Sequence, residues 1–128
     1  MIGPAIVQLL AAAPVAALIG DRVYPVRLPP EPVLPAVAYQ VIGEDRAKAP
    51  RSRPGLVKSM VQLSVIGADY DEAHAVAAAI RAAIDRQRGT FASIDVRDVL
   101  DAGSHDDPGD DSPQLVAMTW HIHWKEAP

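Results

Sequence analysis

Cysteine is absent from the 128-residue chain, and aromatic residues make up only 5% of it. The absence of cysteine excludes disulfides, cysteine zinc sites, iron-sulfur ligation and thiol nucleophiles. The sequence also contains no glycine-rich phosphate loop, no nucleophile elbow and no His-Glu-x-x-His motif. We therefore expect a protein that is not an enzyme, with no catalytic residues and no cofactor.

An excess of basic charge is missing as well, because the formal net charge is -4. Stable nucleic-acid binding depends largely on Lys and Arg side chains that neutralise phosphates, so sequence-specific binding is not expected. The apolar fraction of 49% is ordinary for a folded protein. The length fits one domain, residues 1–128, and we find no internal repeat.

The first twenty residues contain no charged side chain. A secretory signal would have a basic residue before the apolar stretch, whereas the first one here is Arg22. A membrane-spanning helix would be interrupted by Pro14. The apolar spacing instead predicts two short helical pieces, hinged at Pro14 and ending at Gly20, and no membrane association.

Alternating apolar and polar residues predict strands in the rest of the chain. The alternation is clearest in Val57–Ile66 and in Leu115–Trp124. Weaker patterns predict further strands at 22–26, 36–42 and 94–100, with an extended proline-rich connector before residue 36.

A long central helix is predicted after Gly67. Asp69 can cap it, Glu72 is placed to complete a capping box, and Gly89 is expected to end it. The predicted fold class is α+β: a mainly antiparallel sheet of four to five strands, with an N-terminal helix and this long helix packed on one face.

His121 and His123 share one face of the last predicted strand and could bind a metal together. Two imidazoles need further ligands, and the spacing identifies none, so we interpret both as histidines on the solvated face of a sheet. The His105–Asp111 segment does not match the EF-hand pattern and is interpreted as a solvated acidic turn. We therefore assign no metal site, and a small metal-binding or ligand-binding α+β domain stays an alternative.

Opposite charges are concentrated in two segments that we expect to be loops. The basic loop lies between two strands and has no acid from its first to its last basic residue; these residues are Arg46, Lys48, Arg51, Arg53 and Lys58. The acidic loop precedes the last strand; its aspartates are Asp101, Asp106, Asp107, Asp110 and Asp111. In a head-to-tail ring the two segments would face each other on neighbouring copies.

The order of elements and several short phrases resemble the tail-completion, or tail-terminator, proteins of long-tailed phages and phage-like gene transfer particles. The phrases are Ala17–Pro25, Leu34–Pro35 leading into Ala38–Ile42, Val61–Val65, Tyr70–Ala73 with the following helix, and Trp120–Trp124. The resemblance covers essentially the whole chain, and the proline-rich connector and the acidic loop are where this chain is individual.

This resemblance implies a structural protein of the virion that is assembled in the host cytoplasm. It would form a homohexameric ring on the tail tube protein, stop tube growth, bind a head-tail connector or stopper protein, and let double-stranded DNA pass without sequence-specific binding. The basic loop would then lie at the lumen or at a contact between subunits. Another neck protein, a stopper or a head-completion protein, is the main alternative, and the resemblance favours non-contractile tails.

Overall fold

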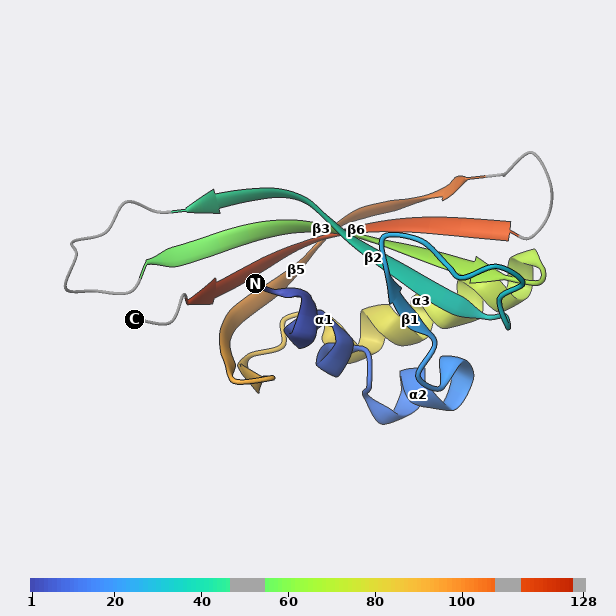
Figure 1. The fold of residues 1–128 in the computed structure, drawn as a ribbon, viewed down its shortest axis with the longest axis horizontal. Coiled ribbons are helices and arrows are strands. Elements are labelled where there is room, and N and C mark those ends of the chain that lie inside the picture. Colours follow the sequence, from blue (N-terminus) through green and yellow to red (C-terminus); the bar gives the residue numbers. More distant parts are fainter. Residues whose placement is uncertain (47–54, 108–113, 126–128) are drawn as a thin grey trace.

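The computed structural model describes residues 1–46, 55–107 and 114–125, which form three helices and one six-stranded sheet (Figure 1). The helices are α1 Gly3–Leu9, α2 Ala13–Ile19 and α3 Tyr70–Ile84. The strands are β1 Val23–Pro25, β2 Ala36–Arg46, β3 Leu56–Gly67, β4 Gly89–Phe91, β5 Ile94–Asp107 and β6 Gln114–Lys125.

The strand order is β1-β2-β3-β6-β5-β4, with β1 parallel to β2 and all other neighbours antiparallel. This confirms the α+β class and the mainly antiparallel sheet, but the expected four to five strands are too few. The additional strand is β4, which has three residues and pairs only with Ile94–Val96 of β5. A segment this short carries too little alternation to be recognised.

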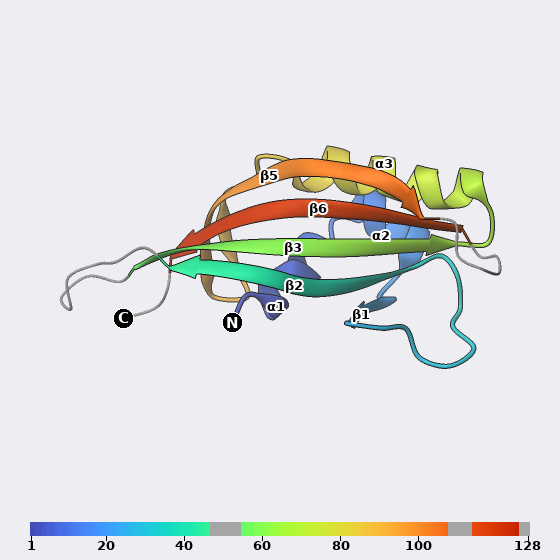
Figure 2. The same cartoon turned by 90° about the horizontal axis from the view of Figure 1, so that it is seen from above.

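The alternation predicted for the two central strands is confirmed. In β3 the buried side chains are those of Val57, Ser59, Val61, Leu63 and Val65, and the intervening residues are more exposed. Trp120, Ile122 and Trp124 of β6 are buried on the same side. All three helices cover this side of the sheet, and Figure 2 shows the other face without a helix over it.

Helix α3 begins as the sequence predicts. The Asp69 carboxylate accepts a hydrogen bond from the Glu72 amide at 2.8 Å, and the Glu72 carboxylate accepts one from the Ala68 amide at 2.9 Å. The start of α3 is pressed against the end of β3, because a Cβ on Gly67 would lie 2.6 Å from the Ala73 nitrogen. The capping pair and the glycine therefore fix how the strand turns into the helix.

Two predicted helix boundaries are wrong. Pro14 is not a hinge, because the break precedes it and Pro14 lies in the first turn of α2, where its missing N–H costs nothing. Gly89 does not end α3, which stops at Ile84; the glycine opens β4 instead. The β4–β5 hairpin turns at Ala92 and Ser93, both with positive φ, in place of the Asn-Gly or Asp-Gly pair that would have indicated this turn.

Arg22 connects the two ends of the segment between α2 and β2. Its guanidinium donates to the Pro35 carbonyl at 2.9 Å and to the Leu18 carbonyl at 3.2 Å. One side chain therefore joins the end of α2 to the proline-rich connector just before β2. This arginine belongs to the Ala17–Pro25 phrase that carries part of the family resemblance.

Candidate assembly surfaces

The two oppositely charged segments lie at opposite ends of the sheet. The basic segment follows Arg46 of β2 and leads into Leu56 of β3, and Leu56 pairs with Lys125. The acidic segment follows Asp107 of β5 and leads into β6, and Asp107 pairs with Leu115 at the other end of β6. Figures 1 and 2 show the described ends of the β2–β3 pair and of the β5–β6 pair at opposite ends of the sheet.

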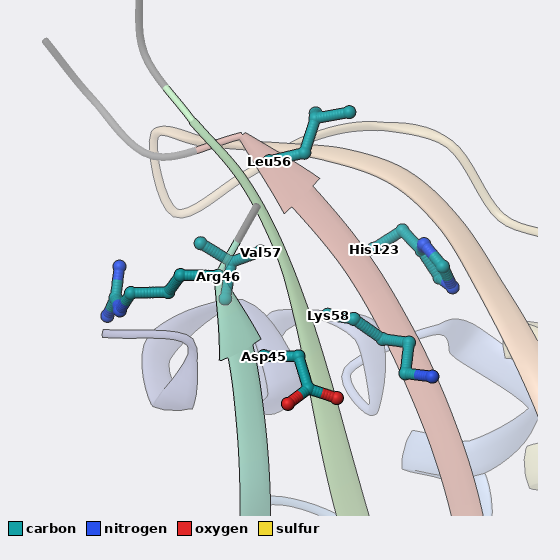
Figure 3. Close-up of a pocket in the computed structure, with 6 residues that line it drawn as sticks. All are labelled: Asp45, Arg46, Leu56, Val57, Lys58 and His123. Atoms are coloured by element: carbon teal, nitrogen blue, oxygen red, sulfur yellow. The ribbon is translucent and has the colours of Figure 1, made fainter. Parts of the chain in front are cut away.

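At the basic end, Arg46 and Lys58 point to opposite faces of the sheet (Figure 3). Arg46 pairs with the buried Val57, so it lies on the helix side, whereas Lys58 pairs with Asp45 and His123 on the bare face. The Arg46 guanidinium binds the Glu44 carboxylate at 3.3 Å. A hollow of about 290 Å³ at this end is lined by Asp45, Arg46, Leu56, Val57, Lys58 and His123.

The other residues of the basic loop, Lys48, Arg51 and Arg53, lie outside the described residues, as do Asp110 and Asp111 of the acidic loop. The role of both loops therefore stays a prediction. The expected acidic loop is wrong over residues 101–107, which continue strand β5. Strand propensity is low for aspartate and glycine, so this half of β5 has no strand signal in its own sequence.

Side chains of α3 bind the acidic half of β5. Arg81 donates to the Asp101 carboxylate at 3.2 Å and to the Ser104 hydroxyl at 3.3 Å. Nearer the start of α3, His74 Nε2 lies 2.6 Å from an Asp106 carboxylate oxygen. The His74 ring packs against the Tyr70 ring, with centroids 4.2 Å apart. The helix thus adds side-chain contacts to a stretch of low strand propensity that pairs with β6.

The histidines of β6 lie on the bare face, as expected. His121 pairs across the sheet with Met60 and Leu100, and His123 with Lys58 and Asp98. Within residues 1–46, 55–107 and 114–125, no three His, Asp or Glu side chains gather closely enough to hold a metal ion.

An apolar groove beside the edge of β2 is the surface that the sequence analysis missed. It has a volume of about 830 Å³ and is lined mainly by α1, β1 and β2; its apolar side chains include Met1, Val7, Val26, Tyr39 and Val41. Val7, Val26 and Val41 are 42%, 58% and 37% exposed. These residues are far apart in the sequence: the pairing of β1 with β2 brings Val26 close to Tyr39, and Gly3 of α1 lies beside the Tyr39 ring.

Nowhere in the described part of the chain is a helix both long enough and apolar enough to cross a membrane.

Comparison with known proteins agrees with the architecture. No curated protein matches the sequence. A solved chain from a structure described as "Virion of native gene transfer agent (GTA) particle" matches with a TM-score of 0.69 and 22% identity, over 95% of this chain and 92% of that chain. At this identity the likeness establishes the fold alone.

The family profile for tail completion protein gp17 matches residues 4–124, which covers every described helix and strand almost completely. The chain therefore belongs to the tail completion protein gp17 family, and it is a structural protein of the tail of a virion or phage-like particle.

Proposed function

We propose that this chain is a ring-forming tail terminator at the head-proximal end of the tail tube. The observation that carries the proposal is the family match over residues 4–124. In this role the protein stops polymerisation of the tube protein and joins the finished tail to a head connector or stopper protein. A homohexamer with an open centre would leave a channel for double-stranded DNA.

The polarity of the sheet supports this role. A terminator must bind the tube on one side and present a different surface on the other, since a symmetric surface would allow growth to continue. The chain has this asymmetry, because residues 46–58 contain five basic residues without an acid and residues 101–111 contain five aspartates without Lys or Arg. The two segments extend from opposite ends of the sheet.

The neutral middle of the bare face also suits a DNA channel. Across its middle, Gln40, Gln62 and Thr119 lie side by side, and they are neutral. A channel lined by such residues would make few fixed phosphate contacts, so DNA would slide through it. We place the basic loop at the lumen or at a contact with a neighbouring subunit or the tube.

Deleting the gene tests the role directly. We expect tails of uncontrolled length, measured by electron microscopy of the particles, because nothing would then stop the tube. Tails of normal length with heads that leak DNA would instead identify a stopper or head-completion protein. The same micrographs of complemented cells should show a ring at the head-proximal end of the tube.

A further inference from the structure

Two strands on opposite edges of the sheet are covered over only part of their length. Strand β1 pairs with Val37–Tyr39 of β2, and β4 pairs with Ile94–Val96 of β5. Beyond these positions, residues 40–46 and 97–107 have no strand on their outer side among the described residues. Unpaired edge groups are templates for another strand. On β5 the Val99 carbonyl already accepts a hydrogen bond from the Arg86 amide, so the part of this edge that can accept a strand is residues 101–107.

The backbone of β2 is oriented to make such bonds. The Val37 amide donates to the Arg22 carbonyl and the Tyr39 carbonyl accepts from the Val26 amide, so alternate residues face outward. By the same alternation, Val41 directs its N–H and C=O to the open edge. Three antiparallel steps separate β2 from β5, which makes β5 antiparallel to β2. A second copy in the same orientation therefore presents β5 in an antiparallel direction.

The surfaces near the two edges differ in the size of their exposed side chains. The apolar groove beside β2 has bulky exposed side chains, among them Met1 and Val7. Near β5, the outer face of α3 exposes Ala75, Ala78 and Ala82, three small residues on successive turns. Alanine lets a neighbouring element approach closely, whereas a solvated helix face normally carries charged or polar residues.

The two open stretches carry opposite charges at their ends. Within the protomer, Arg46 also binds Glu44 and Asp101 also binds Arg81. Arg27 follows β1 at the Tyr39 end of the β2 edge, and Arg46 lies at the other end. Asp101 and Asp107 bracket a stretch of β5 of similar length. Antiparallel pairing brings Arg46 toward Asp101 and Arg27 toward Asp107. Glu44 and Asp45 lie between the arginines, where β5 offers the uncharged Ala102 and Gly103.

We propose that copies of this chain join edge to edge: the open stretch of β2 in one copy pairs antiparallel with the open stretch of β5 in the next. The apolar groove of the first copy then packs against the alanine face of α3 in the second. Because the two surfaces differ, the contact is heterologous and repeats in one direction, as a ring requires. The inference rests on the ring proposed above and names the contact that holds it.

The absence of cysteine makes a cross-linking test clean. Ile42→Cys lies on the β2 stretch and His105→Cys lies opposite it on the β5 stretch, and both positions are exposed. Assembled particles containing the double variant, treated with a short bis-maleimide, should give a covalent ladder of this chain on a denaturing gel. The single Ile42→Cys variant should give only monomers, because two β2 edges do not meet.

Matched substitutions test the groove. Val7→Glu places a charge in the groove, whereas Leu18→Glu makes the same change at a similarly exposed position of α2, 40% against 42%. We expect Val7→Glu to lower the ladder yield on the order of tenfold and Leu18→Glu to leave it unchanged. Equal yields in the two variants would overturn the part of the proposal that assigns the groove to the next copy.

The outcomes separate this inference from the proposed function. Complete particles without a ladder would overturn edge pairing and leave the terminator role intact, and so would dimers from Ile42→Cys alone. Normal tail length after gene deletion would overturn the terminator role, whatever the ladder shows. A ladder that requires both cysteines supports the edge contact.

Discussion

At the β5–β6 end of the sheet, α3 binds the charged strand through Arg81 and His74. At the β2–β3 end, Arg46 is bound by Glu44 of its own strand, and Lys58 lies opposite Asp45 on the other face. The acidic end therefore uses part of its charge inside the protomer. At the basic end Arg46 is bound within its own strand as well, so the charge of the adjoining segment is a candidate for contacts with other subunits in addition to the proposed approach of Arg46 to Asp101.

The strongest test of this comparison reverses the charge at the basic end. Arg51→Glu with Arg53→Glu should lower the yield of completed particles on the order of tenfold, because a basic contact with a neighbour, the tube or DNA would become repulsive. The melting temperature of the purified protein should not change. If the variant gave the same yield of completed particles as the parent, the segment would make no contact that assembly needs.

A charge swap distinguishes a contact with the neighbouring copy from a contact with the tube or the lumen. Asp110→Lys with Asp111→Lys reverses the other end by the same number of charges. If the two ends meet on neighbouring copies, the combined quadruple variant should recover particle yield. If the basic end contacts the tube or the lumen, the quadruple variant should remain defective.

The second test compares Gly67, near the acidic end of the sheet, with Gly43, near the basic end. Gly67→Ala should lower the free energy of unfolding by about 3 kcal/mol, because the new Cβ meets the backbone of α3. Gly43→Ala, where nothing lies within 4 Å of the added carbon, should change it by less than about 0.5 kcal/mol. Urea denaturation measures both. Similar losses would show that the acidic end is not the more tightly packed one.

A third test probes the core of the basic end. The Trp124 indole donates to the buried Ser59 hydroxyl at 2.9 Å, whereas the buried Trp120 indole N–H has no partner in the described residues. Trp124→Phe should therefore cost about 1 kcal/mol more than Trp120→Phe, since only the first leaves a buried hydroxyl unpaired. Adding Ser59→Ala to Trp124→Phe should recover part of the lost stability, which thermal unfolding of the purified variants measures. No difference between the two Trp variants would assign Ser59 a water partner.

Sequence reasoning predicted the central strands and the edge strand β1, but missed the edge strand β4 and the second half of β5, for physical reasons. Val57–Ile66 and Leu115–Trp124 alternate because each has one buried face, and the Asp69–Glu72 box is a local signal. The acidic half of β5 pairs with β6 and is contacted by side chains of α3, and no local pattern encodes these long-range contacts. The apolar groove was not predicted for the same reason, because its residues come from segments that are far apart in the sequence.

The smallest expected effect comes from breaking the Arg81–Asp101 ion pair between α3 and β5. Arg81→Ala removes an ion pair whose side chains are 43% and 31% exposed, so solvent screens it and the loss should be about 0.5 to 1 kcal/mol. Adding Asp101→Asn should cost little more, because the pair is already broken, and the double-mutant cycle isolates the coupling. The effect should shrink in high salt. A coupling near zero would mean that packing alone holds this half of β5, and the two ends of the sheet would then differ in charge but not in how that charge is used.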